Sequence, residues 1–383
     1  MRKIGCVILA LCLLLTALPV AASAAELEVA GKSAVLMDAA TGTILYEKNA
    51  HEKLPPASVT KVMTMLLIME AIDAGRIGWQ DMVTASETAA AKGGSQIYLK
   101  AGETMSVTEL LKSIAVSSAN DAACAMAEHI AGSEAAFVSM MNEKAAQLSM
   151  HDTHFVNCTG LDDDPNAAEH LTCAHDIAIM SRQLLLYHPK IKEFTTIWMD
   201  TVRGGSFGLA NTNKMVRFYP GCTGLKTGFT QKAGYCLSAS AQRDGMELIA
   251  VVMGADSSQD RFNACKQMLD HGFANYALVT PELEENYEIP VKLGLSGSVT
   301  AVPAEDVTLL LDKAHKHSVT TEVRLEPTLE APVSQGQKVG TLTVKAGDQV
   351  LRQVHMVAKE AVRKLTWGQI FANLLQQITM RGG

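Results

Sequence analysis

A serine and a lysine three residues apart, Ser58 and Lys61, stand where a proline-led loop meets an apolar run. The apolar side chains of that run recur at helical spacing: Val59, Val62, Met63, Leu66 and Leu67. Residues three apart share one face of a helix, so this spacing predicts that the Lys61 amine lies beside the Ser58 hydroxyl. The pair constrains the chain more than any other feature, because both side chains must meet near the start of one helix.

The chemistry of this pair depends on its surroundings. A serine hydroxyl is a weak nucleophile until a neighbouring base takes its proton. A lysine can be that base only if burial or another cation lowers its pKa. The apolar neighbours of Lys61 favour a dry environment, and the N–H groups at the helix start favour negative charge beside Ser58. The alternative is a serine that caps the helix, followed by a solvated lysine.

The first 24 residues have the pattern of a secretory signal. Arg2 and Lys3 precede an apolar stretch from Ile4 to Val20, and Ala22-Ser23-Ala24 forms a small-residue cleavage site. We therefore expect residues 1–24 to be removed from an exported protein. An uncleaved N-terminal anchor is the alternative.

The formal net charge is −7 and becomes more negative without Arg2 and Lys3, which disfavours a nucleic-acid partner. Outside the signal the cysteines are scattered without metal-type pairing: Cys124, Cys158, Cys173, Cys222, Cys236 and Cys265. We interpret them mostly as buried thiols. A cross-strand disulfide between Cys222 and Cys236 is an open alternative.

Hydrophobic periodicity predicts an α+β catalytic domain over residues 25–281, with one mainly antiparallel sheet. Two β-type runs around a turn at Gly42 predict a hairpin. The predicted helices cover 58–75, two segments of 106–131 broken near 117–120, 134–148, 173–187 and 258–276, and further strands cover 235–241 and 246–253.

The sequence pattern changes after Pro281, from long helical periods to short β-type runs. Short β-type runs punctuated by Gly, Pro and Asp predict a small β-sandwich domain over residues 282–358. These runs cover 299–302, 307–311, 320–325, 338–344 and 349–357.

Residues 359–383 have the pattern of an amphipathic helix. Its apolar stripe consists of Trp367, Ile370, Phe371, Leu374, Leu375 and Ile378, and the nearby charges are Arg363, Lys364 and Arg381. A cationic helix that bears a tryptophan can lie in an anionic membrane surface, which is our prediction. Packing against the β domain is the alternative.

Two further motifs accompany the serine and lysine. Ser118-Ala119-Asn120 falls in the break between two predicted helices, and Lys226-Thr227-Gly228 precedes Phe229. Each of the patterns Ser-x-x-Lys, Ser-x-Asn and Lys-Thr-Gly occurs once in the chain. Taken singly, Asn120 could cap the following helix and the last motif could be an exposed strand end with a glycine bulge.

With these three motifs in this order, the chain resembles the serine penicillin-binding proteins, and among them the low-molecular-weight D-alanyl-D-alanine carboxypeptidases. The resemblance extends to Leu36-Met37-Asp38-Ala39-Ala40-Thr41-Gly42, the segment 153–161, Lys232-Ala233-Gly234-Tyr235, the β domain and the terminal helix. It implies a penicillin-binding-protein/β-lactamase-like transpeptidase fold, no cofactor and no metal, and action on the extracytoplasmic face of the cell membrane. The implied partners are peptidoglycan stem peptides ending in D-Ala-D-Ala, with β-lactams as acylating inhibitors.

The resemblance also assigns roles in acyl transfer. Ser58 would attack the penultimate carbonyl, Lys61 would take its proton, and Ser118 would pass a proton towards the leaving amine. The N–H groups of Ser58 and Phe229 would stabilise the negative charge on the carbonyl oxygen.

The remaining motif residues are expected to bind substrate. Asn120 would hold Lys61 and a substrate amide, while Lys226 and Thr227 would face the terminal carboxylate. Gly228 would leave room for the substrate backbone as an added strand. Two lysines in one pocket are also expected to lower each other's pKa. Arg261 could approach this pocket or lie on a helix surface.

Three other functions compete with this one. A β-lactamase of class A needs a Glu-x-x-x-Asn loop, but Glu169 is followed by His170-Leu171-Thr172-Cys173. A zinc peptidase would have to use His151, Asp152, His154, His170 and His175, whose spacing matches no zinc pattern. An inactive wall-binding protein would not require all three motifs to be intact.

Overall fold

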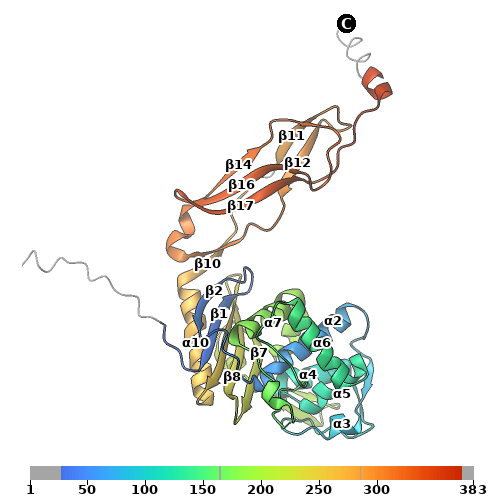
Figure 1. Ribbon diagram of the computed structural model, residues 1–383, viewed down its shortest axis with the longest axis vertical. Coiled ribbons are helices and arrows are strands. Elements are labelled where there is room, and N and C mark those ends of the chain that lie inside the picture. Colours follow the sequence, from blue (N-terminus) through green and yellow to red (C-terminus); the bar gives the residue numbers. More distant parts are fainter. Residues whose placement is uncertain (1–26, 164, 285, 373–383) are drawn as a thin grey trace, which may run out of the picture.

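The computed structural model describes residues 27–372 except 164 and 285, so the predicted signal segment lies outside the described residues. An α+β unit forms one end of the molecule, and an elongated β unit extends away from it (Figure 1). The predicted α+β class is confirmed.

The helices of the first unit, with their bounds, are α2 (Lys61–Asp73), α3 (Glu87–Ala90), α4 (Val107–Ser117), α5 (Asn120–Ala131), α6 (Glu134–Gln147), α7 (Ala174–Tyr187), α8 (Lys192–Thr195), α9 (Met215–Phe218) and α10 (Ser258–Asn275). Short 3₁₀ turns are η1 (Ala57–Thr60), η2 (Ala167–Glu169) and η3 (Pro189–Ile191). The strands are β1 (Ser33–Asp38), β2 (Ile44–Lys48), β3 (Met82–Thr84), β4 (Thr104–Ser106), β5 (Met199–Val202), β6 (Phe207–Ala210), β7 (Cys222–Thr230), β8 (Gly234–Arg243), β9 (Met246–Ala255) and β10 (Tyr276–Val279).

An antiparallel five-stranded sheet in the order β2-β1-β9-β8-β7 lies between two helical layers. Alternate residues of a strand point to opposite faces, so Ile249 and Val251 enter the core with α2 and α7, whereas Leu248 and Ala250 enter the core with α10. Figure 1 shows α10 on one side of the sheet and α7 with its neighbours on the other. Burial on both faces explains the continuous apolar run of β9.

Local sequence signals located most helices and the first hairpin correctly. The β1–β2 hairpin is confirmed, with Leu36 opposite Tyr46. Ser106 caps α4 by accepting a hydrogen bond from the Glu109 N–H, and the predicted break falls between Ser117 and Asn120. The short antiparallel strand pairs β3–β4 and β5–β6 were not predicted, because strands of three or four residues carry little periodicity.

The helix predicted from Ser58 starts differently. Ala57 has a positive φ of 49°, and the chain makes the 3₁₀ turn η1 before α2 begins at Lys61. Pro56, not Ser58, stands at the N-cap of η1, and no side chain caps that turn. The capping alternative for Ser58 is therefore wrong.

The β unit is built on a six-stranded sheet in the order β14-β16-β17-β12-β11-β15. Its elements are β11 (Tyr287–Lys292), β12 (Ser298–Pro303), β13 (Leu309–Asp312), η4 (Lys313–Ser318), β14 (Val319–Leu325), β15 (Leu329–Glu330), β16 (Lys338–Ala346) and β17 (Gln349–Ala358). β11 and β15 were not predicted. β13 pairs with β10 of the first unit, so two strands link the units.

The terminal helix is only partly described. Residues 367–372 are helical, while Leu374, Leu375, Ile378 and Arg381 lie outside the described residues. Among the described residues no helix has the length and apolar character needed to cross a bilayer. The six cysteines beyond the signal segment are free thiols, so the alternative of a disulfide between Cys222 and Cys236 is wrong in this structure.

Candidate active site

The Ser58 and Lys61 side chains meet as their spacing predicts. Lys61 Nζ lies 3.0 Å from Ser58 Oγ and donates a hydrogen bond to the Thr159 carbonyl oxygen at 2.8 Å. Lys61 is 0% exposed, whereas Ser58 is half-buried. The serine is thus reachable from solvent while the amine beside it is not.

Burial shifts the protonation of this amine. It lowers the pKa of Lys61 from 10.5 to about 7, although the nearby Cys158 and Asp121 act in the opposite direction. A lysine with that pKa is neutral in a large fraction of molecules at neutral pH, so it can accept a proton. The dry environment expected from the apolar neighbours of Lys61 is therefore the cause, whereas the second lysine, also expected to lower this pKa, is not among the causes for Lys61.

The second lysine, Lys226, is also buried, in the middle of β7. Its Nζ donates to the Thr227 carbonyl oxygen at 2.9 Å. Burial lowers the pKa of Lys226, and the positive charges of Lys61 and Arg261 lower it further. β7 packs against η1 and α2, which brings the two lysines into one region. Lys226 and Thr227 are buried, so the exposed-strand-end alternative for the motif is wrong.

Gly228 is the point where β7 meets the nucleophile turn. A Cβ on Gly228 would lie 2.7 Å from the Pro56 carbonyl oxygen and 3.1 Å from the Ser58 nitrogen. The residue must therefore be glycine because the chain itself packs there, which is a different reason from the predicted room for substrate. β7 is an edge strand of the sheet, so its outer side offers backbone groups to an added strand.

Arg261, on α10, is buried rather than on a helix surface. Its Nη1 donates to the Gly228 carbonyl oxygen at 2.8 Å and to the Cys236 carbonyl oxygen at 3.2 Å. The neighbouring Phe229 is exposed and stacks on Tyr235 with ring centroids 4.3 Å apart. Arg261 therefore holds the backbone of β7 directly before Phe229.

The middle motif occupies a sharp break between α4 and α5. Ser118 is buried with a left-handed φ of 62°. Asn120 does not cap α5, since Ala119 is the N-cap and Asn120 is the first helical residue. Its Nδ2 donates to the Gly93 carbonyl oxygen at 2.7 Å, and its Oδ1 is buried without a hydrogen-bond partner in the described structure. The predicted bond to Lys61 is not formed here, and the unpaired oxygen is available to another donor.

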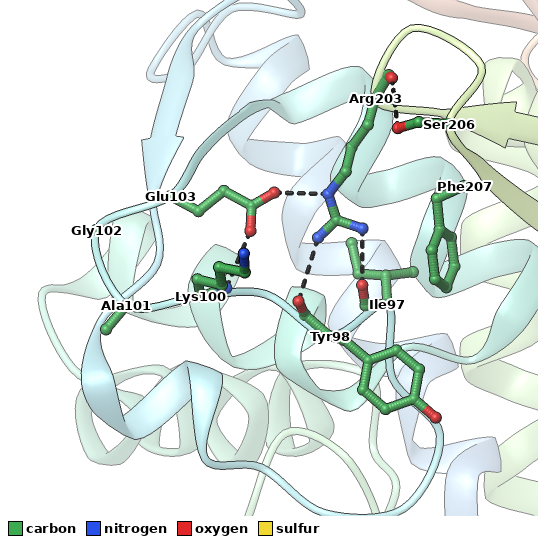
Figure 2. A pocket seen from close by; sticks show the side chains of 9 residues that line it. All are labelled: Ile97, Tyr98, Lys100, Ala101, Gly102, Glu103, Arg203, Ser206 and Phe207. Carbon is green, nitrogen blue, oxygen red and sulfur yellow. Dashed lines mark hydrogen bonds and ion pairs between the residues drawn. The ribbon is translucent and has the colours of Figure 1, made fainter.

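A loop from Gly93 to Glu103 supports this motif, and sequence reasoning missed it. The Asp121 carboxylate accepts hydrogen bonds from the N–H groups of Ile97 at 3.1 Å and Leu99 at 2.9 Å. On the far side, Arg203 donates to Glu103 Oε1 at 2.6 Å and to the Ile97 carbonyl oxygen at 2.7 Å. Figure 2 shows this clamp beside a cavity of about 590 Å³. No local pattern relates Arg203 to residues a hundred positions earlier.

The histidines considered as zinc ligands are engaged in other ways. His170 contacts Thr60, and His154 lies 3.2 Å from the Glu169 carbonyl oxygen. Within the described part of the chain, a ligand-type group of three is formed by His51, Asp152 and Cys173. Burial raises the pKa of Cys173 to about 12, which opposes the thiolate that a metal would bind.

Comparison with known families decides the relationship. Residues 20–257 match the peptidase family S11 model, described as D-alanyl-D-alanine carboxypeptidase, and residues 282–364 match the C-terminal domain of penicillin-binding protein 5. This chain belongs to the D-alanyl-D-alanine carboxypeptidase family. The resemblance seen in the sequence is confirmed.

The alignments with carboxypeptidase relatives cover most of this chain and most of each relative. The D-alanyl-D-alanine carboxypeptidase DacF of Bacillus subtilis is 43% identical over 88% of this chain and 87% of its own. DacC of Escherichia coli is 34% identical over 91% and 87%. Penicillin-binding protein 5 from Haemophilus influenzae has a TM-score of 0.77 at 30% identity, covering 88% of this chain and 99% of that one.

A second similar solved structure contains a bound β-lactam. Penicillin-binding protein D2 from Listeria monocytogenes, in its ampicillin-bound form, is 31% identical with a TM-score of 0.59 and covers 65% of this chain and 99% of its own. The penicillin-binding-protein fold followed by an all-β domain is thereby established for this family member.

Proposed function

We propose that this chain removes the terminal D-alanine from peptidoglycan stem peptides ending in D-Ala-D-Ala, through an acyl-enzyme on Ser58. The observation that carries the proposal is the buried Lys61 amine, with a pKa of about 7, 3.0 Å from the Ser58 hydroxyl. A base with a pKa near the working pH combines the correct protonation state with useful basicity.

In the proposed acylation, Ser58 Oγ forms a bond to the penultimate carbonyl carbon while its proton moves to Lys61 Nζ. The N–H groups of Ser58 and Phe229 stabilise the oxyanion. The carbon–nitrogen bond then breaks, and Ser118 relays a proton to the amine of the departing D-alanine. Water hydrolyses the ester and restores the Ser58 hydroxyl, so that one peptide bond is cleaved for each water consumed.

Substrate binding uses the other motif residues in this proposal. The peptide adds to the open edge of β7, where Arg261 fixes the Gly228 carbonyl. Lys226 and Thr227 supply positive charge and a hydroxyl for the terminal carboxylate, and the Thr227 hydroxyl is held by Thr212 Oγ1 at 2.6 Å. The unpaired Oδ1 of Asn120 accepts from the substrate amide or from Lys61.

Release of D-alanine from a pentapeptide ending in D-Ala-D-Ala tests the assignment. We expect release by the wild-type protein and none by Ser58→Ala, together with a stable radiolabelled-penicillin adduct on Ser58 of the wild type. Rapid turnover of the penicillin would instead favour a β-lactamase, and intact pentapeptide would favour a wall-binding protein.

We also propose that the protein is exported by its N-terminal segment, that residues 25–281 and 282–358 act as separate domains, and that residues 359–383 lie on the membrane surface. Trp367 is 87% exposed and Phe371 is 64% exposed, which supports a lipid contact over packing on the β domain. Cosedimentation of the mature protein with anionic vesicles, weakened by Trp367→Glu, tests the membrane contact. Equal cosedimentation of both proteins would refute it.

A further inference from the structure

Ala57, the residue directly before Ser58, is held in an uncommon backbone conformation. Ala57 has a φ of 49°, in the left-handed region that residues with a Cβ seldom adopt. Such a conformation persists only where the surrounding structure fixes it. One side chain that fixes this conformation, Thr60, occupies a variable position of the Ser-x-x-Lys motif, and the other, His170, lies outside all three motifs.

Three hydrogen bonds form a chain that ends at the Ala57 carbonyl. The Val156 N–H donates to His170 Nδ1 at 3.0 Å, so the proton of the neutral ring is on Nε2. The Thr60 hydroxyl donates to the Ala57 carbonyl oxygen at 2.8 Å. Because that hydroxyl proton is in use, Thr60 Oγ1 accepts the Nε2 proton of His170, 2.8 Å away. His170 and Thr60 are both buried, so each bond is sheltered from water.

The backbone at Gly160 packs closely against the same carbonyl oxygen. A Cβ on Gly160 would lie 1.8 Å from the Ala57 carbonyl oxygen and 2.6 Å from Thr60 Oγ1. Glycine is therefore required at 160, and the Ala57 oxygen has its place between Thr60 and the Gly160 backbone.

Because the peptide is planar, fixing the Ala57 carbonyl also fixes the direction of the Ser58 N–H. In a trans peptide the C=O and the following N–H point in opposite directions. Fixing the Ala57 oxygen towards Thr60 thus aims the Ser58 N–H away from His170. The Ser58 nitrogen lies on the β7 side, where a Cβ on Gly228 would come within 3.1 Å of it.

We propose that Thr60 and His170 are positioning residues that keep the Ser58 N–H aimed at the oxyanion. This inference rests on the proposed acyl-enzyme chemistry and deepens it. In this relay, His170 donates a hydrogen bond to Thr60, and Thr60 donates one to the Ala57 carbonyl oxygen. Loss of the relay lets the Ala57–Ser58 peptide rotate, which removes one oxyanion donor without touching Ser58 Oγ or Lys61 Nζ.

The test compares two threonines one turn apart. Thr60 and Thr64 are both 0% exposed, and each donates one hydrogen bond to a carbonyl oxygen: Ala57 for Thr60, Cys158 for Thr64. We expect Thr60→Val to lower kcat for D-alanine release and the rate of penicillin acylation by about tenfold to a hundredfold, with KM little changed. Thr64→Val should lower the melting temperature about as much as Thr60→Val does, because each variant loses one buried hydrogen bond. The kcat of Thr64→Val should stay within about twofold of the wild-type value.

Rescue separates positioning from general destabilisation. Thr60→Ser keeps the hydroxyl and should restore most of kcat. His170→Gln, whose amide can still donate to Thr60, should retain more activity than His170→Phe. Equal kcat for Thr60→Val and Thr64→Val, or for His170→Phe and wild type, overturns the relay. Absence of D-alanine release by wild type would instead overturn the proposed function.

Discussion

The two units of the molecule differ in whether charged side chains are buried in them. In the first unit Lys61, Lys226 and Arg261 are all buried, and the positive charges of Lys61 and Arg261 lower the pKa of Lys226. In the described part of residues 282–364, no charged or polar side chain is buried, and the core consists of residues such as Val339, Leu342 and Met356. Burying a cation costs several kcal/mol unless it is well compensated. Among the described residues the buried cations lie in the first unit, so this difference indicates where the chemistry takes place.

The strongest test of this contrast removes the buried amine. Lys61→Met keeps the length of the side chain, and we expect acylation by penicillin to slow by about a hundredfold to ten-thousandfold because the general base is lost. Thermal stability should hold or rise, since an apolar group replaces a desolvated amine. Rapid-quench acylation and calorimetry measure both effects.

The matched control for that substitution is Lys345→Met in the β unit, where Lys345 pairs with Glu322 on the surface. It should leave acylation unchanged. A Lys61→Met protein that is much less stable yet acylates normally would show that the amine is structural.

A core substitution in the β unit should have the opposite effect to Lys61→Met: it should lower stability and leave activity unchanged. Leu342 is 0% exposed, so Leu342→Ala should lower the unfolding free energy of that unit by about 2–5 kcal/mol through lost burial and a cavity. The kcat/KM for pentapeptide at a temperature where both proteins are folded should stay within about twofold. Denaturant unfolding and D-alanine release measure the two effects. A parallel fall in kcat/KM would mean that the β unit shapes the active site.

The pH profile is the finest test. The base must be neutral, so penicillin acylation should fall about tenfold per pH unit below the Lys61 pKa of about 7 and level off above it. The direction follows from protonation of the amine at low pH. Stopped-flow acylation between pH 5 and pH 9 gives the profile, and Lys61→Met should lack this limb. A flat wild-type profile across this range would require another base.

Local sequence patterns predicted what depends on neighbouring residues. The Ser106 cap, the break at Ser118 and the apolar strand β9 follow from local sequence patterns, and the structure has them. The β5–β6 hairpin was missed because strands of four residues carry little periodicity. The loop that Arg203 clamps was missed because contacts between residues a hundred positions apart leave no mark on a local period.

The sequence by itself determined which groups are present and in what order: two serines, two lysines, an asparagine, a threonine and a glycine in three motifs of one family. Only the tertiary structure decided what those groups can do. The pKa of Lys61 follows from the apolar surroundings that distant segments assemble. The requirement for Gly228 follows from its approach to Pro56, and the aim of the Ser58 N–H follows from Thr60 and His170. The physical reason is that desolvation, steric exclusion and hydrogen-bond direction depend on atoms that meet only after folding.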